Sequence, residues 1–330
     1  MNITVALDQL YTTVTDALLK MDLDPDEATV VCDVLMYAQK RDSTQGLIKI
    51  TEKTILPDAD CTPIATIERS SAIANIDGGG HTGMFVLNHA ALTAIKLVKN
   101  CGIALVNTCN TRSSTGSIGF YARQIAEGGY IALVMAGSPK VMAIQGGIDP
   151  VLGTNPIAIA IPTCNEPLVL DMATAATTWF SIIEARNHNQ TLAQGVAIDE
   201  NGRATIDPVK AMSGALRTIA GAKGSGLALM FEALTAPLAG ASIVGDPKDN
   251  RANTIIAIDP TVVLGNDNYK DSVELLIKRL TESRTVPGTD AIRLPGVSSN
   301  ALAKKCEQNN LITLDQDLYQ QICKIATDSK

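Results

Sequence analysis

The chain has 330 residues, 46% of them hydrophobic and 18% charged, which is enough for one large domain or two medium ones. This composition excludes intrinsic disorder, which requires low hydrophobicity together with high net charge. The 27 basic and 34 acidic residues leave a formal net charge of −7, so we expect no nucleic-acid partner, because phosphate binding requires a basic surface.

The chain shows no sign of a membrane segment or of secretion. Its longest apolar runs, such as residues 131–136, are far shorter than the roughly 20 residues that span a bilayer. The N-terminus lacks a basic region followed by an apolar stretch, and we expect no signal peptide. The seven cysteines are scattered and form no CxxC motif, which is typical of a protein in the reducing cytoplasm.

Both ends of the chain have helical patterns. A second predicted helix starts at the capping residue Asp24, with Pro25 in its first turn and Glu27 three residues after the cap, and extends to about Lys40. Apolar residues at helical spacing predict the helix before it (Leu7, Leu10, Val14 and Leu18). Near the C-terminus, helices are predicted over residues 271–284, 298–309 and 314–326.

The middle of the chain alternates between strand and helix patterns. Predicted strands cover residues 72–77, 103–106, 131–135, 157–161, 168–171 and 255–258, and predicted helices cover residues 88–100, 120–127 and 224–238. Residues 245–254 form a predicted polar loop. This alternation predicts an α/β core beside a layer of helices from both chain ends.

The short motifs of common cofactor and catalytic sites are absent. No GxGxxG lies between a strand and a helix, and neither a P-loop nor a GxSxG occurs. His81, His89 and His188 form no ligand pair and the cysteines do not cluster, so we expect no metal site. The glycine-rich residues 221–226 leave two interpretations open: an anion site at a helix start, or tight packing of that helix.

Five longer segments carry a resemblance to a known family. They are PVLGTNPIA at 150–158, LDMAT at 170–174, D-x-x-G-x-x-T-x-D-P at 199–208, GAKGSGLA at 221–228 and RLPG at 293–296. Their order and content are similar to those of the type-2 malate/L-lactate dehydrogenase family. That family includes ureidoglycolate dehydrogenase, diketogulonate reductase, sulfolactate dehydrogenase and reductases of cyclic imino acids.

The resemblance implies a fold and an assembly. The expected fold is α/β, a non-Rossmann nicotinamide-binding fold with a large mixed β-sheet and a multihelical subdomain. Residues 1–64 and 265–330 would form the helical subdomain, which carries part of the active site, and residues 65–264 would form the cofactor-binding domain. The family also implies a homodimer, with the active site near the interface, and a small carboxylate substrate.

The resemblance further implies NADH or NADPH as the cofactor, without deciding between them. In the 221–226 loop it favours the anion-site interpretation. For Asp171 it leaves two roles open, a hydrogen bond to a ribose hydroxyl or a cap for the following helix. The positions that match the family's cofactor site are Ser138, Asp171, Met172, Ala173, Lys223, Gly224, Pro295 and Gly296.

The family's catalytic segment is altered in this chain. The family has S-H-G-x-x-R at the end of its second helix, whereas residues 44–49 read TQGLIK. Gln45 therefore replaces the proton-donating histidine, and Lys49 replaces the arginine that binds the substrate carboxylate. A second family histidine is replaced by Ser114, and the histidine before the cofactor lysine is replaced by Ala222.

These replacements favour an imine over a ketone as substrate. Reduction of a ketone produces an alkoxide, so a general acid must supply a proton as hydride arrives. Glutamine does not titrate near neutral pH and cannot act as that acid. A protonated imine already carries its proton, and hydride transfer converts it directly into a neutral amine. The sequence therefore favours a reductase of a cyclic α-imino carboxylate of the pyrroline-2-carboxylate or piperideine-2-carboxylate type.

Each candidate residue has an expected role. Lys49, with Lys53 or Arg112, would hold the substrate carboxylate, and Lys would do so as a point charge without the fork of an arginine. Gln45 and Ser114 would orient the ring. The candidate catalytic residues are Gln45, Lys49, Ser114 and Thr44, and the candidate substrate-binding residues are Lys49, Lys53, Arg112 and Thr154.

Two alternatives remain open. Another residue or an ordered water could supply the proton, and the protein would then be a malate- or lactate-type dehydrogenase that interconverts 2-oxo and 2-hydroxy acids. The other alternative is a catalytically degenerate member of the family that acts as a binding or structural protein.

Overall fold

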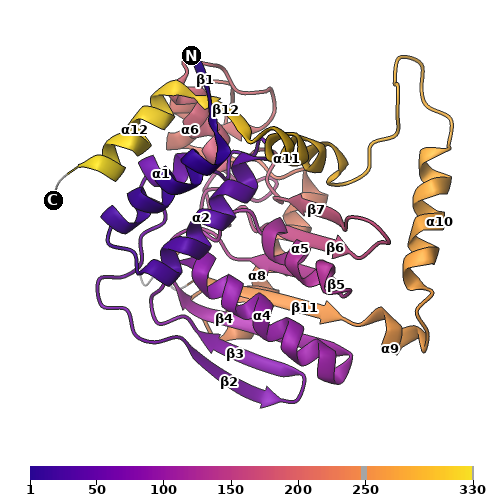
Figure 1. Cartoon of the computed structure of the whole chain (residues 1–330). Helices are drawn as coiled ribbons and strands as arrows, with labels where there is room; N and C mark the ends of the chain where they lie inside the picture. The colour runs from indigo at the N-terminus through magenta and orange to yellow at the C-terminus, as the bar shows by residue number, and fades with distance from the viewer. Residues whose placement is uncertain (247–250, 329–330) are drawn as a thin grey trace.

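A seven-stranded mixed sheet forms the centre of the computed structural model, which describes residues 1–246 and 251–328 (Figure 1). The strand order is β2-β3-β4-β11-β5-β6-β7. The strands are β2 (Ala65–Ser70), β3 (Ile73–Asp77), β4 (Ile103–Thr111), β5 (Ile131–Ala136), β6 (Ile157–Ile161), β7 (Leu168–Met172) and β11 (Arg251–Ile258). Only β3 and β4 pair in parallel, so the sheet is mixed, as expected.

Strand β11 joins the two halves of this sheet. It pairs antiparallel with β4 on one side and with β5 on the other, so that Ile255 faces both Val106 and Val134 in register. Two buried polar contacts fix that register: Asn253 Nδ2 donates to Thr108 Oγ1 at 2.9 Å, and Thr254 donates to Asn107 Oδ1 at 2.9 Å. The sequence predicted only residues 255–258 of this strand, because residues 251–254 were assigned to the polar loop. Residues 247–250 of that loop lie outside the described residues.

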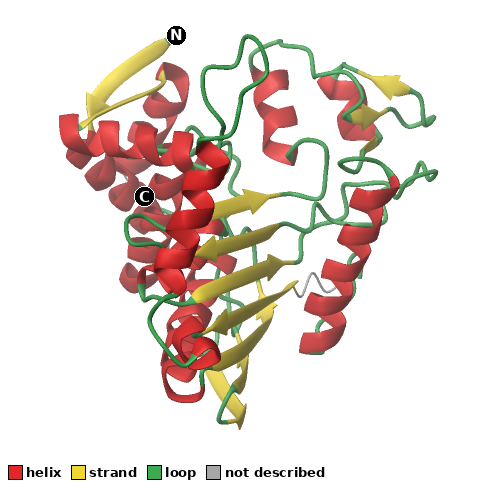
Figure 2. Cartoon of the chain, turned by 90° about the vertical axis from the view of Figure 1, so that its right-hand side faces the viewer, coloured by secondary structure: helices red, strands yellow, loops and turns green. Residues whose placement is uncertain are grey.

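Helices cover both faces of the sheet (Figure 2). Helices α4 (Gly83–Cys101) and α5 (Gly119–Glu127) pack on one face, and α8 (Ala222–Ala239) packs against β4, β11 and β5 on the other. The first face contains the main core, in which Tyr121 is fully buried and donates a hydrogen bond to the carbonyl of Thr115 at 2.9 Å.

The two chain ends meet beside the sheet. Helices α1 (Leu7–Lys20), α2 (Pro25–Gln39) and α3 (Ile48–Thr51) lie near α12 (Gln316–Thr327), with α11 (Val297–Asn309) close by (Figure 1). Strands β1 (Asn2–Ala6) and β12 (Leu311–Asp315) pair with each other in antiparallel direction and so join the two chain ends. The helix predicted from Leu314 therefore begins two residues later, because Leu314 pairs with Ile3. The division into residues 1–64 with 265–330 and residues 65–264 stays a prediction.

The remaining elements form a smaller layer and an arm. Helices α6 (Trp179–Asn187) and α7 (Pro208–Ser213) pack with a three-stranded sheet of β8 (Ala197–Ile198), β9 (Ala204–Thr205) and β10 (Ala215–Leu216). Helices α9 (Pro260–Leu264) and α10 (Tyr269–Thr281) follow β11, and α10 stands away from the body in Figure 1. Among the described residues, no helix is long and apolar enough to cross a membrane.

Glu27 has a different role from the one its position predicts. Asp24 caps α2 by accepting from the backbone of Asp26, but the Glu27 carboxylate does not return to the cap. It is buried and accepts from the backbone of Thr82 at 2.7 Å, while its other oxygen lies 2.9 Å from His81 Nδ1. This histidine therefore ties α2 to the start of α4 and is not at the candidate site.

The central register gives a stability prediction. Thr254→Val removes the hydroxyl that bonds both Asn107 and the carbonyl of Leu234, and leaves the buried Asn107 oxygen without this donor. We expect the free energy of unfolding to fall by about 1–3 kcal/mol, measured by urea denaturation. Thr254→Ser keeps the hydroxyl and is the control, with an expected loss of about 1 kcal/mol for the missing methyl group. Equal losses in both variants would show that the hydrogen bonds contribute nothing.

Candidate functional site

The segments that flank several strands meet at one edge of the sheet, which here means the side where β4, β5 and β7 end. Strands β4 and β5 both run antiparallel to β11, and β7 runs antiparallel to β6, so that β4, β5 and β7 all end at this edge. β6 and β11 begin there. Because the segments after β4, β5 and β7 and those before β6 and β11 converge, residues far apart in the sequence can line one cavity.

A cavity of about 750 Å³ lies at this edge. It contains most of the residues that the sequence nominated, from both the substrate set and the cofactor set. The nominated residues that line it are Gln45, Lys49, Lys53, Arg112, Ser114, Ser138, Thr154, Asp171, Met172, Ala173, Pro295 and Gly296.

Three nominated residues do not line this cavity. Thr44 lies just behind the wall, where its hydroxyl is 3.0 Å from that of the lining residue Thr178. Lys223 is exposed in the first turn of α8. Gly224 is buried, and a Cβ there would lie 2.0 Å from the carbonyl oxygen of Ile219, so this glycine permits the tight packing that was one interpretation of the loop. A cofactor role for Lys223 and Gly224 stays a prediction.

Lys49 is the most unusual side chain of the cavity. It lies in α3 and is only 1% exposed, and its Nζ sits 3.6 Å from the centre of the Phe180 ring. Among the described residues it has no carboxylate within ion-pair distance. Burial, and secondarily the positive charge of Arg251, hold the pKa of Lys49 well below its usual value. Burial thus disfavours the charged form of this amine, and an anion beside it would favour that form.

Two arginines that line the cavity are already engaged by the protein. Arg112 forms an ion pair with Asp58, and Arg251 donates to the carbonyl of Ser113 at 2.6 Å. Arg251 lines the cavity but was not nominated, because its position in a polar stretch carried no signal. Arg112 is thus already paired with an acid, and the roles of Lys49, Lys53 and Arg112 in binding a substrate carboxylate stay predictions.

Asp171 links the end of β7 to the start of α5. Its carboxylate accepts from the Ser117 hydroxyl at 2.6 Å and from the Gly119 backbone at 2.8 Å. Burial raises the pKa of Asp171, while these two hydrogen bonds oppose the rise. The capping interpretation thus applies to α5, which precedes Asp171 in the sequence, whereas the sequence pointed to the following helix. The residue still lines the cavity, so a ribose contact remains open.

The PVLGTNPIA segment builds the opposite wall. The hydroxyls of Ser138 and Thr154 lie 3.2 Å apart, and Ser138 also accepts from the backbone of Asn155. Asn155 is fully buried and donates to the Glu232 carboxylate on α8 at 2.9 Å. The motif therefore anchors this wall to α8. This contact explains why a buried asparagine lies in the segment between β5 and β6.

No histidine lines the cavity in the part of the chain that the structure describes. His81 is paired with Glu27, and His89 lies 2.9 Å from the hydroxyl of Thr66. Within residues 1–246 and 251–328, no group of three His, Cys, Asp or Glu side chains could hold a metal ion. Tyr37 lines the cavity, but burial raises its pKa to about 12, which makes it a weak acid.

The lining of the cavity suits a dinucleotide in its chemistry. Its lining combines hydroxyls, a carboxylate, apolar surface and cations, which are the groups that bind ribose, nicotinamide and phosphates. Two buried polar atoms of lining residues, Arg41 Nε and Ser113 Oγ, have no hydrogen-bond partner in the structure. Such atoms are expected where a ligand completes the site.

Comparison with known proteins places the chain in a family. Residues 5–323 match the model of the malate/L-lactate dehydrogenase family, so the chain belongs to that family of oxidoreductases, as the motifs predicted. The chain is 30% identical to L-sulfolactate dehydrogenase from Methanocaldococcus jannaschii, over 95% of this chain and 93% of that protein. A solved structure of sulfolactate dehydrogenase from the same organism superposes with a TM-score of 0.82, at 28% identity and covering 98% and 96% of the two chains.

Two further relatives carry a cofactor in their names. Ureidoglycolate dehydrogenase (NAD(+)) from Escherichia coli is 26% identical, over 96% of this chain and 94% of that protein. (2R)-3-Sulfolactate dehydrogenase (NADP(+)) from Chromohalobacter salexigens is 29% identical over 73% of each chain. The expected nicotinamide cofactor and fold class are confirmed at the level of the family, and the chain is an oxidoreductase.

Burial of Lys49 gives a stability prediction with a defined pH dependence. The unfolded chain keeps the lysine proton up to the ordinary pKa, whereas the folded chain releases it at lower pH. Between these two values the unfolded state binds more protons, so native stability rises with pH. We expect Lys49→Met to raise the free energy of unfolding by about 1–4 kcal/mol at pH 7, since it removes a buried unpaired amine. This gain should shrink toward pH 10 and is measured by urea denaturation across pH.

Lys53→Met is the matched control for this experiment. Lys53 lines the same cavity but is exposed, so its substitution should change stability little and without this pH dependence. A Lys49→Met variant that is less stable than the wild type at pH 7 would contradict the account of Lys49 as a destabilising buried amine.

Proposed function

We propose that the chain is an NAD(P)H-dependent reductase of a small cyclic α-imino carboxylate, of the pyrroline-2-carboxylate or piperideine-2-carboxylate type. The observation that carries this proposal is a cavity with a buried amine for a carboxylate and no histidine among its described lining residues. When bound, the reduced nicotinamide supplies the hydride for C2 of the imine. Ser138, Asp171, Met172 and Gly296 are the lining residues proposed to hold the cofactor.

The residues at the Lys49 end would bind and orient the substrate. A carboxylate beside Lys49 Nζ would favour the charged ammonium, which burial alone disfavours. Gln45 presents an amide that can hydrogen-bond the ring nitrogen but cannot exchange a proton with it near neutral pH. The substrate therefore has to arrive as the protonated iminium, whose nitrogen leaves as the neutral amine.

A second candidate function rests on the same lysine. A protonated amine whose pKa is lowered is also suited to donate a proton to a developing alkoxide, which leaves the neutral amine. Lys49 could then replace the missing histidine, and the protein would be a dehydrogenase of 2-oxo and 2-hydroxy acids. The names of the sulfolactate relatives are consistent with this chemistry.

Turnover distinguishes the two functions. The purified protein is first titrated with NADH and NADPH by fluorescence, and oxidation of the reduced cofactor is then followed with pyrroline-2-carboxylate, piperideine-2-carboxylate, pyruvate and oxaloacetate. We expect kcat/KM for the imines to exceed that for the keto acids by about tenfold or more. Comparable turnover of the keto acids would overturn the imine proposal and favour the second candidate. Failure to bind either cofactor would indicate a catalytically degenerate protein.

We also propose that the chain forms a homodimer in the cytoplasm. Helix α8 exposes apolar side chains at helical spacing, Leu227, Met230, Leu234 and Leu238, and patches of this kind mark interfaces between subunits. All seven cysteines are free, which supports a reducing compartment.

The dimer proposal predicts a mass of twice the chain mass of 34.7 kDa by light scattering after gel filtration. The double variant Leu234→Glu with Leu238→Glu should elute as a monomer, because it places charges on the apolar face of α8. Leu92→Glu, on the exposed side of α4, is the control and should remain dimeric. A wild-type protein that elutes with the mass of one chain would contradict the proposal.

A further inference from the structure

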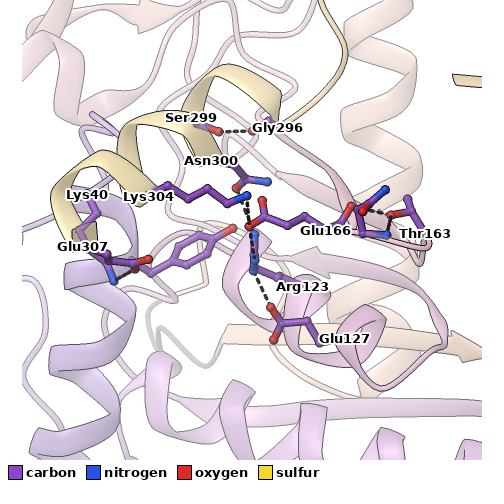
Figure 3. A network of polar contacts seen from close by, with 12 residues as sticks. Lys40, Arg123, Glu127, Thr163, Glu166, Gly296, Ser299, Asn300, Lys304 and Glu307 are labelled. Atoms are coloured by element: carbon purple, nitrogen blue, oxygen red, sulfur yellow. Dashed lines mark hydrogen bonds and ion pairs between the residues drawn. The ribbon is translucent and has the colours of Figure 1, made fainter. Parts of the chain in front are cut away.

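A second, more polar cavity of about 370 Å³ adjoins the first. Tyr37, Arg41 and Asn300 line both cavities and so mark where they meet. The second cavity lies between the end of α2, helix α5 and residues 300–307 of α11 (Figure 3). No residue at this junction was nominated from the sequence.

The acidic groups of this second cavity are already neutralised. Arg123 pairs with Glu127 at 2.7 Å and lies 3.8 Å from Glu166, and Lys304 pairs with Glu166 at 3.0 Å (Figure 3). Lys40 pairs with Glu307 at 2.5 Å. The lining of the second cavity contains four cations and three carboxylates. The cations are Lys40, Arg41, Arg123 and Lys304, and the carboxylates are Glu127, Glu166 and Glu307. The excess positive charge belongs to Arg41, which has no acidic group within ion-pair distance among the described residues.

The guanidinium of Arg41 is held in place without using all of its donors. It stacks on the Tyr37 ring at 3.6 Å from the ring centre, and it donates to the Tyr37 carbonyl at 3.1 Å and to Asn300 Oδ1 at 3.3 Å. Its Nε is buried and has no partner in the structure. An arginine that is oriented but lacks an acid is suited to bind an anion, because its planar fork matches phosphate oxygens.

Asn300 brings a second guanidinium to the same point. Its Oδ1 also accepts from Arg123 Nη1 at 3.1 Å, so one neutral oxygen serves both arginines. Two guanidiniums on one uncharged acceptor repel each other, and an anion between or beside them would relieve that repulsion. Asn300 is therefore a positioning residue, whereas Arg41 is the residue with donors to offer.

We propose that Arg41 binds a phosphate group of the dinucleotide cofactor where the two cavities meet. This inference rests on the proposed function, since it requires that the larger cavity hold the cofactor. The phosphate is either the 2′-phosphate of NADPH or the pyrophosphate that NADH and NADPH share. Both present negatively charged oxygens to a guanidinium, and they differ in which cofactors carry them.

The test compares cofactor affinities of three variants by fluorescence titration with no substrate present. Arg41→Gln removes the charge, Arg41→Lys keeps the charge but removes the fork, and Arg279→Gln removes an exposed arginine of α10 as the control. We expect Arg41→Gln to raise the Kd of at least one cofactor about tenfold or more, Arg41→Lys to give a smaller increase, and the control to match the wild type.

The two cofactors separate the two sources of phosphate. An increase for NADPH alone assigns Arg41 to the 2′-phosphate, and an increase for both assigns it to the pyrophosphate. Loss of this contact should also make Kd less dependent on salt concentration. If Arg41→Gln keeps the thermal stability of the wild type and both Kd values stay within about twofold, the inference is overturned. Failure of the wild type to bind either cofactor would overturn the proposed function itself.

Discussion

The central position of β11 is the constraint on which the rest of the structure depends. β11 comes late in the chain but pairs with both β4 and β5. Without it, no hydrogen bonds would join the two halves of the sheet. Because β11 runs antiparallel to both, β4 and β5 end on either side of the start of β11, where Arg251 lies beside the cavity. The buried contacts of Asn253 and Thr254 hold this register, because a slip would leave polar groups unpaired in the core.

Two side chains in the walls of the cavity form hydrogen bonds to helices on opposite faces of the sheet. Asp171 binds the start of α5, and Asn155 binds α8, so both walls are fixed to helices that pack on opposite faces of the sheet. Lys49 lies between these walls without an acidic partner among the described residues. A buried amine lowers stability, and its retention at a site lined with hydroxyls is consistent with a role in binding or proton transfer.

Two cationic side chains of the site differ in their surroundings. Near Gln45 and Lys49 the surroundings suit a small carboxylate, whereas near Arg41 paired acids leave one guanidinium for an anion. A nicotinamide dinucleotide carries negative charge far from its reactive ring, so separate cationic positions for substrate and cofactor fit one reductase. The proposed imine chemistry and the keto-acid alternative differ in whether Lys49 only binds the carboxylate or also gives up a proton.

The sequence by itself determined the family, the mixed α/β fold and most of the cavity lining, because these reside in contiguous motifs such as PVLGTNPIA and LDMAT and in strong local periodicity. It also showed that Gln45 and Lys49 replace the usual histidine and arginine. Only the tertiary structure decided the state of those residues. Whether Lys49 is buried, whether Arg112 is already paired with Asp58, and whether Arg41 meets Asn300 all depend on contacts between segments distant in the chain. The short strands β1 and β12 were not predicted from the sequence for the same reason. Each is a strand only because the other pairs with it.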